Sequence, residues 1–359
     1  MNLDRRAFVQ GLLAAGAAAA LGPSALAGGA RLRAGARPPI LAGFDPSDPD
    51  AWRTPPGSVD PTLGEVKPAA TPLKLLVLGG TAFLGPHAVE YALARGHEVT
   101  LFNRGKTNPH LFPKLEKLRG DRNDNLKALE EQVGKGRTWD GVLDTSGYFP
   151  RQMDLSCTVL KSAVERYLFI ATINVYKSDE NRGEDETGEL NYDTVEGGDE
   201  KDLRNYGPYK AQCERRAAEL LPGKSLSVRP ALIAGPRDPS DRFTYWPVRM
   251  SLAKGDRVKV LAPLPKEQPV QYIDARDLAR FCITLLENKA TGAFNGIGPA
   301  SPISMGELLA ACAMAAGTAP EMVWATPEQL MFCRGPNSPC GCPPRASTRA
   351  FTRATIPRA

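Results

Sequence analysis

Short apolar runs alternate with amphipathic stretches through the middle of the chain. Residues 73–78 (Leu-Lys-Leu-Leu-Val-Leu) have the length and composition of a buried strand, and residues 97–102 form a second run of this kind. Between them, residues 86–95 carry the periodicity of a helix. Strands that alternate with helices are typical of a parallel sheet. We therefore predict an α/β fold with a doubly wound parallel sheet, followed by a smaller C-terminal lobe.

Later patterns predict the end of the sheet and the lobe. A sixth strand is expected near residues 226–232, and helical patterns cover residues 278–287 and 305–316. We assign both helices to the lobe. Asp277 is expected to cap the helix that begins there, because aspartate is a preferred N-cap residue.

A glycine-rich turn, Gly79-Gly80-Thr81-Ala82-Phe83-Leu84-Gly85, follows the first strand directly. Glycines in this position let the backbone approach a pyrophosphate, and the next helix offers its free N–H groups. Ala82 stands where the usual spacing has another glycine, so a structural turn without a ligand is the alternative.

The residues after the second strand indicate which dinucleotide would bind. Folds that favour NAD place an acidic residue here to bind the ribose hydroxyls, whereas this chain has Asn103 followed by Arg104. An amide and a guanidinium suit a 2′-phosphate, so we expect NADP, with NAD as the alternative. A solvated turn arginine would explain Arg104 equally simply.

Further segments resemble the extended or atypical branch of the short-chain dehydrogenase/reductase superfamily, in particular the NAD-dependent epimerase/dehydratase family. The resemblance runs from Leu73 to about Trp324. In chain order it includes Gly120-Asp121, Asp144-Thr145-Ser146, residues 167–176, Tyr206-Gly207-Pro208-Tyr209-Lys210, Arg229-Pro230, Gly235-Pro236 and residues 271–277. It implies a Rossmann fold whose NAD(P) cofactor is held by Gly79, Gly80, Thr81, Phe83, Leu84, Gly85, Asn103, Arg104, Asp121 and Thr145. It also implies catalysis by Thr172, Tyr206 and Lys210.

The spacing of Tyr206 and Lys210 suits the implied chemistry. Oxidation of a carbinol moves a proton as well as a hydride, and Tyr206 would hold that proton. Lys210, one helical turn later, would favour the phenolate form, and Thr172 would hydrogen-bond the substrate oxygen. Such a Tyr–Lys pair also occurs by chance on helices, and threonine is common in strands. The order of all three behind a glycine turn favours catalysis.

The first 27 residues predict an export signal. Asp4-Arg5-Arg6-Ala7-Phe8 precedes the apolar residues 11–21, and Ala25-Leu26-Ala27 fits a cleavage site. The paired arginines resemble a bacterial twin-arginine signal. We expect a periplasmic or otherwise exported protein with no stable membrane association after cleavage. An anchoring amphipathic helix is the alternative.

Residues 331–359 form an irregular tail with five Arg, five Pro and three Cys but no Asp, Glu or Lys. Disorder is one interpretation, and a zinc or disulfide hook at Cys333, Cys340 and Cys342 is another. We favour a frameshifted reading of the end of the gene, and we expect no metal site.

These features predict a modular chain. We expect a signal peptide (1–27), a Pro/Gly-rich linker (28–72), an NAD(P)-binding Rossmann domain (73–225), a substrate-binding lobe (226–330) and the irregular tail (331–359).

Export bears on the reaction, because no pool of NADPH exists outside the cytoplasm. The signal therefore favours a reaction that returns its hydride within each cycle. We expect an NAD(P)-dependent epimerase/dehydratase-type oxidoreductase that acts on a carbinol or carbonyl substrate, such as a sugar or nucleotide sugar, and that forms a homodimer.

Two other functions are open. One is an NADPH-dependent reductase of small carbonyl or enone compounds. The other is a dinucleotide-binding RNA- or protein-binding module without catalysis, because the Gly-Gly-Thr-Ala-Phe-Leu-Gly turn also resembles that of chloroplast stem-loop RNA-binding proteins.

Charge gives no support to a nucleic-acid partner. The 359 residues carry a net charge of +5, but the tail alone accounts for +5 and the signal for +1. The remaining body holds 38 basic and 39 acidic residues. We therefore expect a small-molecule substrate rather than nucleic acid as the partner.

Overall fold

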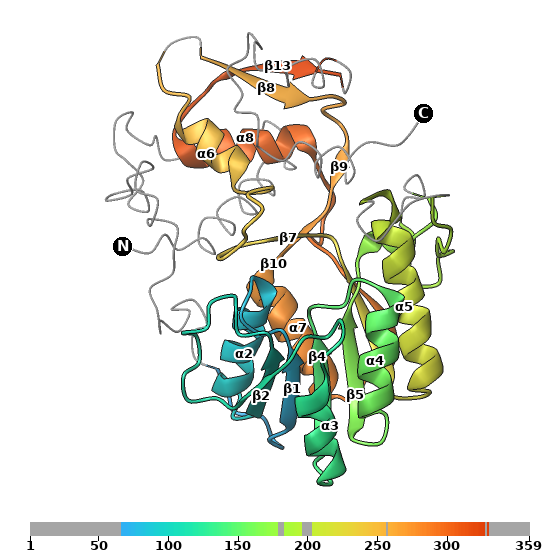
Figure 1. Cartoon of the computed structure of the whole chain (residues 1–359). Coiled ribbons are helices and arrows are strands. Elements are labelled where there is room, and N and C mark those ends of the chain that lie inside the picture. Colours follow the sequence, from blue (N-terminus) through green and yellow to red (C-terminus); the bar gives the residue numbers. More distant parts are fainter. Residues whose placement is uncertain (1–65, 179–182, 196–202, 256–257, 327–328, 330–359) are drawn as a thin grey trace. The chain divides into compact units, whose positions relative to one another are not determined.

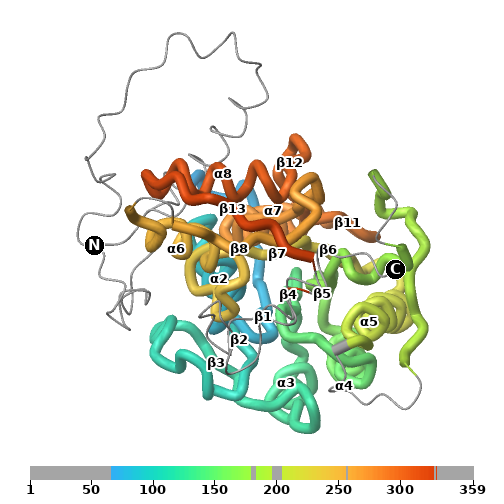
Figure 2. Tube along the Cα trace, turned by 90° about the horizontal axis from the view of Figure 1, so that it is seen from above, coloured from blue at the N-terminus to red at the C-terminus, as the bar shows by residue number. Residues whose placement is uncertain are grey.

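Seven parallel strands form the central sheet of the protein (Figures 1 and 2). The structure is a computed structural model that describes residues 66–178, 183–195, 203–255, 258–326 and 329. The strands are β1 (Lys74–Leu78), β2 (Glu98–Asn103), β3 (Lys117–Arg119), β4 (Trp139–Asp144), β5 (Val164–Ile170), β6 (Ser225–Pro230) and β11 (Gly292–Gly296). Their order is β3-β2-β1-β4-β5-β6-β11, and each neighbouring pair is parallel. The prediction of a doubly wound parallel sheet is confirmed.

Helices cover both faces of this sheet, which explains the apolar strands. They are α2 (Leu84–Ala94), α3 (Lys127–Gly134), α4 (Pro150–Leu160), α5 (Tyr206–Leu220) and α7 (Ala275–Glu287). Successive side chains of a strand point to opposite faces. Leu75 and Val77 therefore pack with α2 and α7, whereas Leu76 and Leu78 pack with α3, α4 and α5.

The helix predicted over residues 278–287 is α7, but its assignment to the C-terminal lobe is wrong. Its buried residues Leu278, Cys282 and Ile283 belong to the same apolar cluster as Ala88 and Val89 of α2. The cap is also different from the prediction. Asp274 is the N-cap and accepts a hydrogen bond from Arg276 N at 2.8 Å, while Asp277 lies in the first turn.

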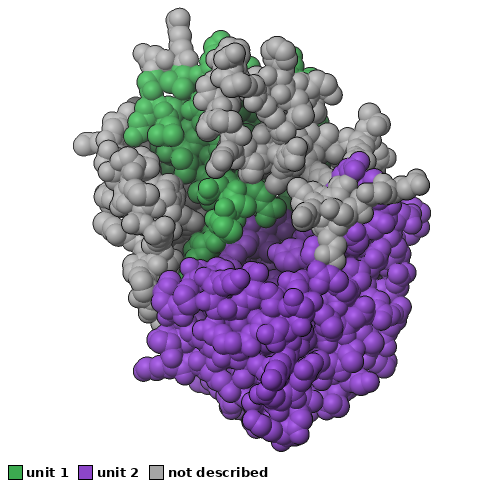
Figure 3. Space-filling model, viewed as in Figure 1, with its two compact units in different colours: residues 1–54, 234–272, 298–359 green, residues 55–233, 273–297 purple. Residues whose placement is uncertain are grey.

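The chain divides into two compact units (Figure 3). The unit with the large sheet is built from two segments, the described residues up to 233 and residues 273–297. The other unit holds residues 234–272 and the described residues from 298 on. Short strands β7 (Leu232–Ala234) and β10 (Tyr272–Asp274) lie at the crossings between the units in sequence. The domain limits expected at residues 72, 225 and 330 stay predictions.

The smaller unit is built from short elements. Helix α6 (Tyr245–Ser251) packs against α8 (Met305–Ala316). Strands β8 (Lys259–Pro263) and β13 (Glu321–Ala325) pair in parallel, and β9 (Pro269–Val270) pairs antiparallel with β12 (Ile303–Ser304). Helix α8 has the bounds predicted from the sequence, because Ser304 and Glu307 form a capping box and Gly317 ends the helix at φ 67°.

The expectations about membrane association and about a metal site can be compared only with the described residues. None of the helices in this part of the chain is long and apolar enough to cross a membrane. No cluster of three or more His, Cys, Asp or Glu side chains that could hold a metal ion occurs among the same residues. The predicted signal (1–27) and the tail with Cys333, Cys340 and Cys342 lie outside the described residues.

A charged clamp joins helices α2 and α7 at the amino edge of the sheet. Glu287 accepts hydrogen bonds from Arg95 Nε and NH2, both at 2.8 Å, and lies 2.8 Å from His97 Nε2. The other ring nitrogen, His97 Nδ1, accepts from Leu73 N at 3.0 Å, so Nε2 carries the proton that faces Glu287. Desolvation alone would raise the pKa of Glu287, but the bonds from Arg95 and His97 hold this pKa below its usual range.

We expect Glu287→Gln to lower the free energy of unfolding by about 1–2 kcal/mol near pH 7, because a charged acceptor of three hydrogen bonds is lost. The lowered pKa means that the carboxylate stabilises the fold above the ordinary pKa of glutamate, and that this contribution disappears as the pH falls through the folded value. Urea unfolding at several pH values measures the effect. The exposed Glu131→Gln of α3 is the matched control; a difference between wild type and Glu287→Gln that is independent of pH would contradict the clamp.

Candidate active site

The glycine turn connects the end of β1 to the start of α2 with little space to spare. Gly79 and Gly80 have φ angles of 109° and 83°, which favour glycine. A Cβ on Gly79 would lie 2.5 Å from Thr145 Oγ1, and one on Gly85 would lie 2.7 Å from the Cα of Gly80. The turn is therefore compact because its glycines lack side chains.

The start of α2 is suited to an anion. Its N-cap residue, Phe83, makes no side-chain capping bond, and the first turn contains no acidic residue. The first N–H groups of a helix lack intrahelical acceptors and carry the positive end of the helix dipole. Of the other predicted residues here, Thr81 and Leu84 are buried. The glycine turn, residues 79–85, together with the free N–H groups at the start of α2, fits the pyrophosphate of a dinucleotide; we call this turn the glycine cradle.

Asn103 holds the turn in place through its side chain. Its Nδ2 donates to Gly79 O at 3.0 Å, while its Oδ1 accepts from Gly105 N at 3.0 Å and from Arg119 NH1 at 2.8 Å. The amide is thus occupied by protein groups. Arg119 was not among the residues predicted from the sequence. Its guanidinium lies against Gly105, as shown by the 2.1 Å that would separate a Cβ on that glycine from Arg119 NH1.

Arg104 and Asp121 face each other at the ends of β2 and β3. Arg104 NH1 lies 4.0 Å from Asp121 Oδ2, and about half of the Arg104 side chain is exposed. A hydrogen bond from the backbone N–H of Asn123 lowers the pKa of Asp121, assisted by the nearby charges of Arg104 and Lys106. The cationic side chains of Arg104 and Lys106 therefore lie close to Asp121.

Tyr206 and Lys210 occupy the first turn and a half of α5. Lys210 is 4% exposed, and its Nζ donates to Gly147 O at 2.6 Å and to Ile170 O at 2.7 Å. This Nζ lies 6.0 Å from the ring centre of Tyr206, 4.8 Å from that of Tyr148 and 4.6 Å from that of Phe169. Burial lowers the pKa of Lys210 to about 8. The ammonium is thus held close to the tyrosine by two backbone carbonyls.

Thr172 follows β5 and begins the short helix η3 (Ile173–Val175). Its side chain accepts a hydrogen bond from Asn174 N at 3.3 Å, and the residue is buried. The start of α5 packs tightly against η3, because a Cβ on Gly207 would lie 2.1 Å from Asn174 O. Thr172 and Tyr206 are therefore carried by two elements in direct contact.

All the predicted site residues lie at the carboxyl edge of the sheet, in two groups. Gly79–Gly85, Asn103, Arg104 and Asp121 follow β1, β2 and β3, whereas Thr172, Tyr206 and Lys210 lie beyond β5 and on α5. Thr145 lies between the groups, and its Oγ1 donates to Leu78 O at 3.0 Å. The strand order reverses between β1 and β4, which is where ligands bind in doubly wound sheets.

A buried ion pair that no sequence pattern predicted lies near this edge, at the end of β4. Arg122 NH1 donates to Asp144 Oδ1, and Tyr167 OH donates to Asp144 Oδ2 at 2.8 Å. Arg122 had no signal in the sequence, since it lies in a polar turn, Gly120-Asp121-Arg122-Asn123-Asp124. Asp144 was named only as part of the Asp144-Thr145-Ser146 segment of the family resemblance.

Comparisons with known proteins agree with the fold. No protein-family model matches the chain. The chain is 26% identical over 286 residues to the chloroplast stem-loop binding protein of 41 kDa b of Arabidopsis thaliana, covering 74% of this chain and 69% of that protein.

Solved structures of three enzymes, two of them epimerases, share the fold at low sequence identity. UDP-glucose 4-epimerase of Thermus thermophilus, in complex with NAD, superposes with a TM-score of 0.53 at 24% identity, covering 71% of this chain and 86% of that chain. WbmG of Bordetella bronchiseptica, in complex with NAD and UDP, gives 0.57 at 18% identity, with coverage of 72% and 84%. UDP-N-acetylglucosamine 4-epimerase of Methanobrevibacter ruminantium, in complex with UDP-N-acetylmuramic acid, gives 0.56 at 16% identity, with coverage of 73% and 86%.

Gly85→Ala is expected to lower the free energy of unfolding by about 1–3 kcal/mol, because the new methyl group would press on the backbone of Gly80. The same displacement should weaken binding of a dinucleotide. Urea unfolding and a fluorescence titration with NAD(P)H measure the two effects. Gly134→Ala is the control, since its Cβ would meet nothing within 4 Å at the end of α3. Equal stability of the two variants would show that the turn has room to spare.

Proposed function

We propose that this protein is an NAD(P)-dependent oxidoreductase of the epimerase/dehydratase type, acting on a carbinol or carbonyl substrate. The observation that carries the proposal is the buried Lys210 ammonium beside Tyr206, at the same sheet edge as the glycine cradle. The fold shared with the NAD-bound structures of UDP-glucose 4-epimerase and of WbmG supports it. A nucleotide sugar is the proposed substrate class, because two enzymes of this fold are UDP-sugar epimerases and the WbmG structure holds UDP.

The side chains divide the chemistry as follows. When bound, the dinucleotide supplies the hydride acceptor and donor. Tyr206 takes the proton from the substrate hydroxyl and later returns it. Lys210 stabilises the phenolate through its positive charge, which its pKa of about 8 leaves largely protonated at neutral pH. Thr172 donates to the substrate oxygen and orients it.

We further propose that the cofactor is NADP. Arg104 is half exposed beside the glycine turn, and Arg119 lies next to Asn103, so two guanidinium groups are available for a 2′-phosphate. No acidic residue occupies the position that follows β2, where NAD-selective folds bind the ribose hydroxyls.

The predicted twin-arginine signal leads to a related proposal, that the protein is exported from the cytoplasm. An exported enzyme would keep its dinucleotide bound and regenerate it in each cycle. An epimerisation or an internal dehydration does this, whereas a reductase consumes NADPH. The purified protein is therefore proposed to carry its dinucleotide.

Binding of RNA is the second candidate, favoured by the 26% identity to a chloroplast stem-loop binding protein. The balanced charge of the body gives this candidate no electrostatic support. The buried Lys210 ammonium beside Tyr206 has a role in the proposed reaction, whereas binding of RNA would not need it.

Tyr206→Phe is expected to reduce turnover of a UDP-sugar by about 10²–10⁴-fold, because the hydroxyl that carries the proton is lost. The bound dinucleotide, measured by absorbance after denaturation, should be unchanged. Turnover is followed by chromatography of a panel of UDP-sugars. Tyr209→Phe, in the same turn of α5, is the control and should keep full activity.

Three outcomes would count against this assignment. Full turnover by Tyr206→Phe would remove the tyrosine from the mechanism. Stoichiometric oxidation of NADPH with small carbonyl compounds would indicate a reductase. Tight binding of stem-loop RNA without turnover of any sugar would favour the binding module.

Arg104→Ala should weaken binding of NADPH by at least about fivefold and leave NADH binding nearly unchanged, because a guanidinium contact to the 2′-phosphate is worth on the order of 1 kcal/mol or more at an exposed site. Equilibrium fluorescence titration of dinucleotide-free protein measures both. Lys127→Ala, at an exposed position on α3, is the control for net charge. An equal loss for both dinucleotides would contradict the preference for NADP.

A further inference from the structure

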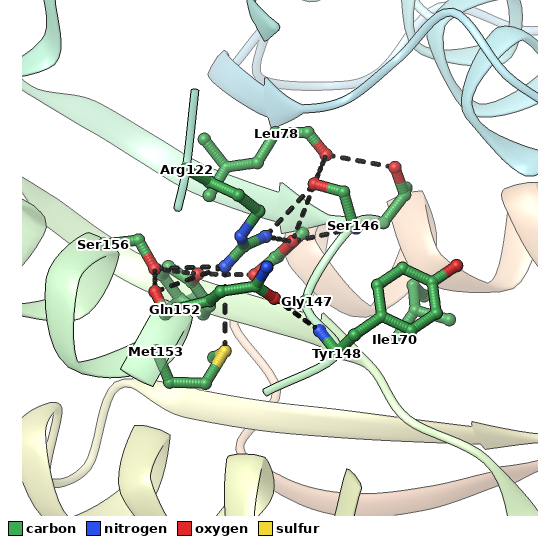
Figure 4. Close-up of polar contacts among 12 residues, drawn as sticks. Leu78, Arg122, Ser146, Gly147, Tyr148, Gln152, Met153, Ser156 and Ile170 are labelled. Atoms are coloured by element: carbon green, nitrogen blue, oxygen red, sulfur yellow. Dashed lines mark hydrogen bonds and ion pairs between the residues drawn. The ribbon is translucent and has the colours of Figure 1, made fainter. Parts of the chain in front are cut away.

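A buried ion pair joins Arg122 to Asp144, the last residue of β4. Figure 4 shows the Arg122 side chain beside Ser146, Gln152 and Ser156, with which it makes hydrogen bonds. The Arg122 side chain is 8% exposed, and the Asp144 side chain is fully buried. Both carboxylate oxygens of Asp144 are used, one by Arg122 and one by the hydroxyl of Tyr167. The charges therefore neutralise each other within an apolar cluster that includes Met153 and Phe169.

Stability alone does not explain such a pair. Removal of two charges from water offsets most of their attraction, and apolar residues of similar size usually stabilise a fold as well or better. In addition, Arg122 Nε is buried without a hydrogen-bond acceptor in the described part of the chain. The contacts that the pair makes with its neighbours therefore matter more than its own contribution to stability.

The pair holds the turn that follows β4. Arg122 NH1 donates to Ser146 Oγ at 3.1 Å, and Ser146 N donates to Asp144 Oδ1 at 3.0 Å. Ser146 Oγ in turn lies 3.1 Å from Leu78 O, at the end of β1. The backbone from residue 144 to residue 147 is thereby bound to both the ion pair and the glycine turn.

The same turn presents a carbonyl to the proposed catalytic lysine. Gly147 O accepts from Lys210 Nζ at 2.6 Å. Gly147 is pressed against the pair, because a Cβ on it would lie 3.1 Å from Asp144 Oδ2 and 2.7 Å from the Phe169 ring. A shift of Asp144 would move Gly147 O and, with it, the ammonium.

We propose that Arg122 and Asp144 are positioning residues that fix the Gly147 carbonyl and thereby hold the Lys210 ammonium at Tyr206. This inference rests on the proposed function, since it assigns a role in the same reaction. Neither residue need touch the substrate or the dinucleotide. Their action on Lys210 is both mechanical, through the turn, and electrostatic, through two opposite charges.

The surroundings of Lys210 predict the sign of the electrostatic effect. The titratable and charged groups that act on it are Asp144, Arg122, Cys213, Glu214, Tyr148 and Tyr206. Asp144 raises the pKa of Lys210 and Arg122 lowers it. Loss of one partner should therefore shift the pKa of Lys210 in the direction opposite to loss of the other.

The experiment compares three variants: Asp144→Asn, Arg122→Met and the double variant with both substitutions. The pKa of Lys210 is measured in dinucleotide-free protein by NMR titration of ¹³C-labelled lysine, with Lys210→Met to assign the signal. Asp144→Asn should lower this pKa and Arg122→Met should raise it, each by roughly one unit. The alkaline limb of the pH–kcat profile should move in the same directions.

The double variant separates positioning from stability. It leaves no uncompensated buried charge, so it should fold and bind the dinucleotide as the wild type does. Its kcat should fall by roughly 10–100-fold with little change in KM, because the turn no longer fixes the carbonyl. Glu287→Gln is the matched control: it weakens a clamp at the opposite edge of the sheet, and should lower stability without changing kcat or the pH profile.

The outcomes are decisive in each case. A double variant with wild-type kcat would overturn the proposal, as would an unshifted Lys210 pKa in both single variants. If neither single variant folds, the kcat of the double variant tests the proposal. If the wild-type protein turns over no substrate, the proposed function fails, and the lysine titration still reports whether the pair acts on Lys210.

Discussion

The backbone carbonyl of Leu78, the last residue of β1, is the point on which the carboxyl edge of the sheet depends. Its oxygen accepts hydrogen bonds from Thr145 N, Thr145 Oγ1 and Ser146 Oγ at 3.0–3.2 Å. These bonds hold the end of β4 against β1 at the place where the strand order reverses. Gly79 follows immediately, and it lies so close to Thr145 that a Cβ would not fit. One close contact therefore sets both the shape of the glycine turn and the position of the turn whose Gly147 carbonyl accepts from Lys210.

The elements predicted correctly from the sequence are those whose signals are local. Strands β1 and β2 are buried along most of their length, and their apolar runs were enough to place them. Helix α8 carries a capping box at one end and a left-handed glycine at the other, and its bounds were predicted without error. The cap of α7 was misplaced because the helical pattern was expected to begin at residue 278, whereas the helix begins at Ala275, after Asp274.

The features that escaped prediction depend on contacts between distant parts of the chain. Strand β11 has glycine at both ends and a weak intrinsic preference for strand, and it forms through its parallel pairing with β6. Helix α7 joins the large sheet because its apolar face meets α2, a partner almost 200 residues earlier in sequence. Arg122 reaches Asp144 only once β3 and β4 lie in their places in the sheet. No pattern of residues near Arg122 could have predicted that pair.

Burial of charge and backbone geometry identify the same edge of the sheet by independent routes. The glycine cradle is recognised from its φ angles and close approaches, which involve no charged group. Near the carboxyl ends of β4 and β6, the pairs Arg122–Asp144 and Arg229–Glu214 are more than nine-tenths buried, as is Lys210. Burial opposes the charged form of Lys210, as its pKa of about 8 records, and apolar residues often replace buried ion pairs without loss of stability. A fold selected for stability alone would not gather these groups in one place. Asp144, Arg122 and Glu214 all act on the charge of Lys210, so members of both buried pairs meet electrostatically at the lysine beside Tyr206.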